Sequence, residues 1–247
     1  MRWIYLSPHL DDAVLSAGGL IHDQAKAGIP VEIWTFMCGV PADTEFSMFA
    51  QVLHYQWGFA SAEETVLARR AEDRRAAQIL GAQAQHFDFL DCIYRRGRDG
   101  AWLYTDIYAP PHEDDADLPA QIAAAIAPRL QPDDVLVCQL AVGSHVDHVI
   151  VRRAAELLGR PLLYDADIPY LQNYPADLAP KTAGMQEKVY AVSEAGLRSW
   201  GEAVLAYQSQ ISTLGGGFNI PQSIHESLRS YWQERQGIRL WERAEGL

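Results

Sequence analysis

The sequence lacks several features that mark other classes of protein. It has three cysteines, Cys38, Cys92 and Cys138, and no Cys-x-x-Cys pair. This argues against a zinc ribbon or a disulfide framework and favours buried thiols in a reducing compartment. No apolar run approaches the ~18 residues of a membrane span, and the N-terminal apolar stretch is too short for a signal peptide. We therefore expect a cytoplasmic protein without a membrane span.

Positive charge is also scarce. The 247 residues include 20 Lys and Arg against 32 Asp and Glu, a formal net charge of −12. A nucleic-acid-binding surface needs a basic stripe, so nucleic acid is not an expected partner. The length favours a single α/β domain over residues 1–247, and it leaves open whether the chain forms a homo-oligomer.

Short apolar runs alternate with longer amphipathic stretches along the chain. The expected strands are Trp3–Leu6, Val31–Met37, His86–Leu90, Asp134–Leu140, Pro161–Tyr164 and Lys188–Val192. The expected helices are Ala13–Ala27, Ala62–Leu80, Leu118–Leu130, Val149–Leu158 and Glu194–Ser209, with Asp117 placed to cap the third. This alternation predicts a Rossmann-like, doubly wound and mainly parallel sheet with helices on both faces.

Two polar clusters each follow directly after an expected strand. The first is Ser7-Pro8-His9-Leu10-Asp11-Asp12, and the second is Gly143-Ser144-His145-Val146-Asp147-His148. Ligands of open α/β sheets bind beyond the carboxyl ends of the strands. If the two strands are neighbours in the sheet, the clusters face each other in one crevice. The long segments 39–61 and 91–117 are expected to supply its walls.

Two imidazoles and one carboxylate in these clusters form a set of metal ligands. His9, Asp12 and His148 would supply the nitrogen and oxygen donors that suit zinc, and three protein ligands leave a position open for water. The same set also describes the non-haem iron triad, so the residues alone leave the choice between zinc and iron open.

The remaining polar side chains of the clusters suit the chemistry of hydrolysis. Asp11 lies next to a ligand and is free to take the proton of an activated water. His145 precedes His148 by three residues and could stabilise a tetrahedral intermediate. Asp147 could orient one of the imidazoles through its other ring nitrogen.

Ser-Pro-His-Leu-Asp-Asp-Ala with the later His-Val-Asp-His resembles the N-acetylglucosaminyl-phosphatidylinositol de-N-acetylase (PIG-L, or LmbE-like) family. The resemblance spans roughly residues 1–215, with Leu10, Ala13 and Val146 replacing a proline, a glutamate and a proline of the family pattern. It implies a Rossmann-like fold and zinc-dependent hydrolysis of N-acetyl groups on amino sugars. It also implies the roles given above: His9, Asp12 and His148 as metal ligands, Asp11 as the base and His145 as the residue that stabilises the oxyanion. Arg69, in an Arg-x-x-Glu helix like that of the family, is implied to contact a small amino-sugar-like substrate.

Other functions remain open at this point. The same metal site would serve an amidase acting on a non-sugar amide, such as a thiol conjugate. A non-catalytic nucleotide-binding module is disfavoured, because Asp11 and Asp12 stand where a pyrophosphate would bind. The acyl group, the amine product and the pathway cannot be read from the sequence.

Overall fold

The structure, a computed structural model, describes residues 1–211 and 221–243. Within these residues seven strands form one sheet in the order β3-β2-β1-β4-β5-β7-β6. Their bounds are β1 Trp3–Ser7, β2 Val31–Thr35, β3 Gln83–His86, β4 Val135–Gln139, β5 Leu162–Asp165, β6 Met185–Ala191 and β7 Gly237–Arg243. Strands β1 to β5 pair with one another in parallel, whereas β7 pairs antiparallel with both β5 and β6. The expected mainly parallel sheet is confirmed.

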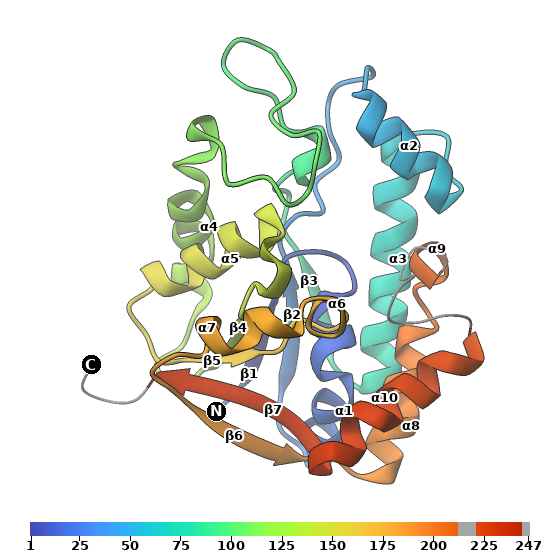
Figure 1. Cartoon of the computed structure of the whole chain (residues 1–247), viewed down its shortest axis with the longest axis vertical. Coiled ribbons are helices and arrows are strands. Elements are labelled where there is room, and N and C mark those ends of the chain that lie inside the picture. The colour runs from blue at the N-terminus through green and yellow to red at the C-terminus, as the bar shows by residue number, and fades with distance from the viewer. Residues whose placement is uncertain (212–220, 244–247) are drawn as a thin grey trace.

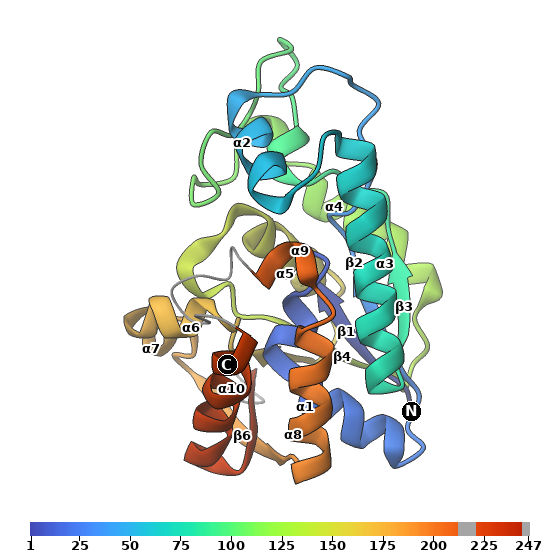
Figure 2. The same cartoon turned by 90° about the vertical axis from the view of Figure 1, so that its right-hand side faces the viewer.

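Helices cover both faces of the sheet (Figure 1). On one face α1 (Asp12–Lys26), α3 (Ala62–Leu80) and α8 (Glu194–Val204) pack together, with α10 (Pro221–Arg235) beside α8. The other face carries α4 (Leu118–Ile126) and α5 (Val146–Leu157), which pack against each other. Shorter helices are α2 (Met48–Trp57), α6 (Tyr170–Asn173), α7 (Leu178–Lys181) and α9 (Gln208–Ile211). Helix α2 lies at the same end of the molecule as the long loop before α4 (Figures 1 and 2).

Two glycines allow a close contact between α1 and α8 on that first face. A Cβ added at Gly18 of α1 would lie 2.4 Å from a ring carbon of Trp200, and one added at Gly19 would lie 2.7 Å from Val192. The fully buried Trp200 indole on α8 also donates to the carbonyl oxygen of Val14 at 2.7 Å. The Gly-Gly pair therefore lets α8 approach α1 and seal that side of the core.

Some elements differ from the sequence-based expectation. The third strand is Gln83–His86 rather than His86–Leu90; it lies at the sheet edge, partly exposed, so it carries no continuous apolar run. Strand β7 and helices α2 and α10 were not expected. Asp117 stands at the N-cap of α4, but its side chain makes no capping hydrogen bond, so that prediction is wrong.

The sheet topology brings the two polar clusters together. Strand β1 lies between β2 and β4, with Trp3 beside Val31 on one side and beside Val135 on the other. The chain continues outward from β1 through β2 to β3, and from β4 to β5 in the opposite direction. The carboxyl ends of β1 and β4 therefore flank the switch point, where ligands of such sheets bind.

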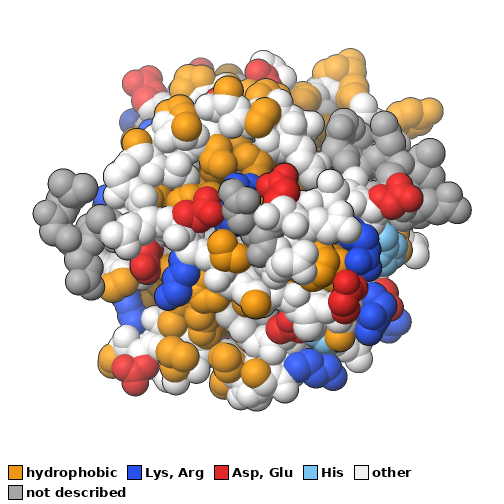
Figure 3. Space-filling model, turned by 60° about the horizontal axis from the view of Figure 1, so that its bottom comes forward, with side chains coloured by type: hydrophobic (Ala, Val, Ile, Leu, Met, Phe, Trp, Pro, Cys, Tyr) orange, Lys and Arg blue, Asp and Glu red, His pale blue; other side chains and the backbone are white. Residues whose placement is uncertain are grey.

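Charged side chains are mixed on the surface. On the face drawn in Figure 3, Lys and Arg side chains are interspersed with Asp, Glu and hydrophobic side chains. The cysteines Cys38, Cys92 and Cys138 are free and buried, as expected. Among the described residues no helix combines the length and the apolar character needed to cross a membrane.

A partly buried ion pair between Arg2 and Asp134, just before β4, predicts a pH-dependent stability. Burial opposes the charge of Asp134, but its hydrogen bonds from Arg2 and from the amide of Gln131 outweigh it and lower its pKa. A lowered folded-state pKa contributes stability above the unfolded value of about 3.9, which is lost as the pH falls through the folded value. Asp134→Asn should cost about 1–3 kcal/mol at pH 7, and the gap from the wild-type protein should narrow as the pH falls below ~4.

Urea unfolding at pH 7 and pH 3.5 measures both quantities. The neighbouring Asp133 is exposed, so Asp133→Asn is the matched control and should change little at either pH. A gap for Asp134→Asn that persists undiminished at low pH would contradict the ion-pair explanation.

Candidate active site

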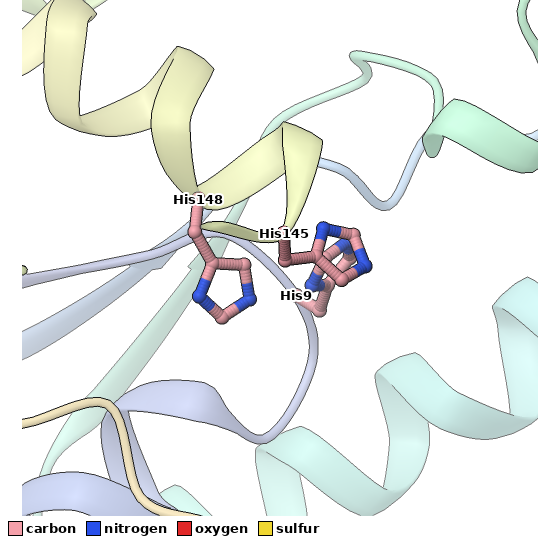
Figure 4. A group of neighbouring side chains, drawn as sticks. All are labelled: His9, His145 and His148. Atoms are coloured by element: carbon pink, nitrogen blue, oxygen red, sulfur yellow. The ribbon is translucent and has the colours of Figure 1, made fainter. Parts of the chain in front are cut away.

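The two strands β1 and β4 each end in a turn that presents polar side chains to the switch point. After β1, the hydroxyl of Ser7 accepts a hydrogen bond from the amide of Ala13 at 3.1 Å, and the amide of His9 donates to Asp12 Oδ2 at 2.8 Å. These bonds fold the loop back on the first turn of α1. After β4, His145 caps α5 by accepting from the amide of Asp147 at 3.2 Å. The rings of His9, His145 and His148 gather between the two turns (Figure 4).

The carboxylate of Asp12 lies at the centre of this cluster. Its Oδ2 is 3.2 Å from Nδ1 of His9 and 3.3 Å from Nε2 of His148. The three residues expected as metal ligands thus meet at one oxygen atom. All three are buried, with exposed fractions of 8% for His9, 4% for Asp12 and 0% for His148.

The opposite nitrogen of each imidazole faces another buried carboxylate. Nε2 of His9 is 3.0 Å from Asp147 Oδ2, and Nδ1 of His148 is 2.9 Å from Asp167 Oδ1. Asp147 also accepts from the amide of Cys92 and pairs with Nη1 of Arg95 at 2.6 Å. Each ring is therefore held on one side by a carboxylate and presents its other nitrogen to Asp12, an arrangement typical of metal-ligating histidines.

Charge in the cluster follows from these contacts. Burial alone would raise the pKa of Asp12, but the imidazoles of His148 and His9 lower it well below its usual range. Burial opposes protonation of His148, yet the charge of Asp12 and the hydrogen bonds to Asp12 and Asp167 raise its pKa to about 9. Contacts with Asp12 and Asp147 likewise raise the pKa of His9 against its burial. The cluster therefore attracts positive charge, as a cation site must.

Asp11 differs from its neighbour in both contacts and acidity. Burial and the charge of Asp12 raise the pKa of Asp11 to about 7, with Arg69 and His9 acting against them. Nη2 of Arg69 is 3.7 Å from Asp11 Oδ2, and its guanidinium lies over the ring of Trp57 at 4.8 Å from the centroid. A carboxyl group with a pKa near neutral pH is suited to accept and return a proton.

His145 is held in one neutral tautomer. Burial, and then the nearby charges of His9 and His148, lower its pKa well below its usual value. Because the amide of Asp147 donates to Nδ1, that nitrogen carries no proton in the neutral ring. The proton is therefore on Nε2, which makes His145 a hydrogen-bond donor at that nitrogen.

These side chains open into a cleft of about 460 Å³. His9, Asp11, Asp12, His145 and Arg69 line it, whereas Asp147 and His148 lie behind it and are fully buried. The segments 39–61 and 91–117 both supply walls, as expected: α2 contributes Phe49, Leu53, Gln56 and Trp57, and the second segment contributes Asp91, Ile93, Thr105, Asp106, Ile107 and Tyr108.

Two residues of the cluster, Asp167 and Arg95, were not predicted from the sequence. Asp167 follows β5 by two residues, so the same rule that found the clusters after β1 and β4 would have found it. Arg95 lies within the long segment 91–117 and carries no comparable signal. Its Nε also pairs with Asp115 at 2.8 Å, so it ties that segment to Asp147 behind the cleft.

Among the described residues, possible ligand atoms lie within 4.8 Å of one another in two groups, His9 with His145 and His148, and His9 with Asp91 and Asp147. The second group is less suited to a metal ion. The carboxylate of Asp147 is already paired with the guanidinium of Arg95 and the amide of Cys92. A metal ion there would face the positive charge of Arg95 and compete for the His9 nitrogen that points to Asp147. The existing contacts of Asp147 therefore disfavour its use as a metal ligand.

Comparison with known proteins shows which family and which enzymes the chain resembles. The sequence model of the family described as PIG-L: GlcNAc-PI de-N-acetylase matches residues 4–158. The chain is 26% identical to 2'-N-acetylparomamine deacetylase from Niallia circulans over 236 residues, 87% of this chain and 82% of that protein.

Solved structures show the same fold. A deacetylase of the teicoplanin biosynthesis pathway, in complex with bog, is 29% identical with a TM-score of 0.87, and each chain is covered to 100%. The zinc-inhibited form of teicoplanin deacetylase is 28% identical with a TM-score of 0.85 and the same full coverage.

The buried pair of Arg95 and Asp147 yields a stability prediction. Arg95→Met leaves the carboxylate of Asp147 buried without its cation, and this should cost about 3–5 kcal/mol of unfolding free energy. The neighbouring Arg96 pairs with Asp43 at 3.1 Å in a partly exposed position, so Arg96→Met should cost no more than about 1 kcal/mol. Chemical denaturation of both variants measures the difference, and equal costs would refute the special role of Arg95.

Proposed function

The chain belongs to the PIG-L family of GlcNAc-PI de-N-acetylases, and on this premise we propose that it is a zinc-dependent hydrolase that removes an acetyl group from the nitrogen of an amino sugar or its conjugate. The observation that carries the proposal is the convergence of His9 and His148 on one oxygen of Asp12, at 3.2 and 3.3 Å. The relatives named deacetylases support the reaction class.

The residues of the cluster fit a metal ion. Nε2 of His148 is fully buried, and its contact with Asp12 Oδ2 at 3.3 Å lacks the geometry of a good hydrogen bond, so a cation would satisfy this nitrogen. We propose that His9, Asp12 and His148 are the metal ligands, a set of two nitrogens and one carboxylate oxygen that suits zinc. When bound, zinc supplies Lewis-acid polarisation of the substrate carbonyl and lowers the pKa of a water molecule.

The chain's own residues would then handle the protons. Asp11, with its pKa near 7, accepts a proton from the water that attacks the amide carbon. The Nε2–H of His145 donates a hydrogen bond to the carbonyl oxygen as negative charge develops there. As the C–N bond breaks, protonated Asp11 returns its proton to the leaving nitrogen, and the products are acetate and a free amine. We propose that Asp147 assists by orienting His9.

The cleft walls support a substrate larger than the acetyl group. Phe49, Leu53 and Trp57 are spaced four residues apart on α2, so they present one apolar side of that helix to the cleft. Trp57 also stacks under Arg69, which we propose contacts the substrate. Such a wall suits the ring face of a sugar or the apolar part of a conjugate.

A substrate panel with controlled metal content tests the function. We expect protein stripped by a chelator to be inactive, and one equivalent of zinc to restore release of acetate and amine from an N-acetyl amino sugar. The panel compares N-acetylglucosamine, N-acetylparomamine, an N-acetylglucosaminyl glycopeptide and an N-acyl thiol conjugate.

The metal arm of this experiment needs a stepwise titration, because zinc is associated with an inhibited form of one relative. Activity should increase until one equivalent of zinc has been added. The protein loaded with iron(II) should consume no oxygen. Hydrolysis of the thiol conjugate alone would move the assignment to a non-sugar amidase. No amide hydrolysis with any divalent metal would refute the proposal.

The adjacent aspartates give the sharpest mutational test. Asp11→Asn keeps the shape of the side chain but cannot accept a proton, so it should retain zinc while the turnover number falls about 10²–10⁴-fold. Asp12→Ala removes a proposed ligand, so it should lower both zinc content and turnover. Metal analysis together with steady-state kinetics measures both. Loss of zinc from Asp11→Asn, or near-normal turnover in its zinc-loaded form, would show that Asp11 is not the base.

A further inference from the structure

The carboxylate of Asp167 makes two contacts behind the cluster. Its Oδ1 is 2.9 Å from Nδ1 of His148, and its Oδ2 accepts from the amide of Val142 at 3.0 Å. The side chain is fully buried, as is that of His148. While Asp167 is ionised it can only accept hydrogen bonds, and Nδ1 of His148 is then the donor in this contact.

The backbone around Asp167 fixes the position of that carboxylate. The residue has a φ of +51°, in the left-handed region that aspartate adopts more readily than most residues. Its amide donates to Asp165 Oδ1 at 3.0 Å, and its carbonyl accepts from the amide of Leu171 at 3.0 Å. The turn after β5 thus aims Asp167 at α5, next to the proposed metal ligand.

The same turn also holds the ring of His148 from its side. Tyr170 follows three residues later, and its ring packs edge-on against His148 with the centroids 5.0 Å apart. Tyr170 lines the cleft, whereas Asp167 lies behind it. One short segment therefore packs against the ring of His148 and also contacts its Nδ1 nitrogen.

We propose that Asp167 is a positioning residue that holds His148 in the tautomer protonated on Nδ1, and so keeps the lone pair of Nε2 directed at Asp12 and available to a metal ion. This inference rests on the proposed function, since it takes His148 as a ligand. Asp167 differs from Asp147 in its contacts: Asp147 shares its charge with Arg95, whereas Asp167 directs its charge to the imidazole itself.

The contact with Val142 makes the asparagine variant informative. Asparagine has one carbonyl oxygen, and the amide of Val142 requires an acceptor. If that oxygen serves Val142, the NH₂ group faces Nδ1 of His148 and favours the tautomer protonated on Nε2. That tautomer cannot bind a metal through Nε2.

Zinc affinity of the full chain, measured by competition with a chelator, tests the proposal. Asp167→Asn should raise the zinc dissociation constant about 10–100-fold over the wild-type value. The matched control is Asp73→Asn, since Asp73 is also buried and accepts from a histidine, His86, at 2.8 Å. This control should bind zinc with wild-type affinity. An unchanged affinity in folded Asp167→Asn would overturn the role of Asp167 while leaving the proposed function intact.

A second measurement uses the wild-type protein alone, so it holds even if the variant does not fold. In the zinc-loaded protein, ¹⁵N NMR of the histidine rings should show His148 protonated on Nδ1 and metal-bound through Nε2. The opposite assignment would overturn the proposal. A wild-type protein that binds no zinc at all would overturn this inference and the proposed function together.

Discussion

A buried carboxylate held between two imidazoles is the interaction on which the rest of the site depends. Asp12 is 4% exposed, and a charge in that position needs partners close by. His9 and His148 supply them, but each can do so only if its other nitrogen is also satisfied. Asp147 and Asp167 meet that need, and Arg95 balances Asp147 in turn. Every buried charge in the cluster is thus matched with another, which fixes the geometry around the position proposed for the metal.

The sheet makes this convergence possible. Strands β1, β4 and β5 are successive neighbours, and each ends at the same edge of the sheet. The turn after the first carries His9 and Asp12, the first turn of α5 after the second carries His148, and the turn after the third carries Asp167. Because parallel strands hold their carboxyl ends in register, residues as far apart in the chain as His9 and Asp147, 138 positions, meet on a rigid frame. Rigid placement of this kind is what metal coordination and proton transfer require.

The difference between Asp11 and Asp12 shows how environment separates identical side chains. Asp12 faces two imidazoles that hold it ionised, whereas Asp11 faces the cleft, where burial and the charge of Asp12 raise its pKa to about 7. Arg69 limits that rise from a distance of 3.7 Å. When two neighbouring carboxyl groups have different pKa values, the more acidic one is suited to be a metal ligand and the less acidic one to be a base.

The sequence by itself determined the parallel sheet and the two motifs. The spacing of apolar residues and the polar residues that follow strands are local signals, so they can be read without knowing the tertiary contacts. It predicted that His9 and His148 would face each other, which depends only on β1 and β4 being neighbours. It did not reveal Arg95, the exact position of β3 or the pairing of β7, whose roles arise from contacts with distant segments. Only the tertiary structure decided which carboxylate holds which imidazole: Asp147 could have oriented any of the three rings, and burial beside Arg95 and Cys92 directs it to His9.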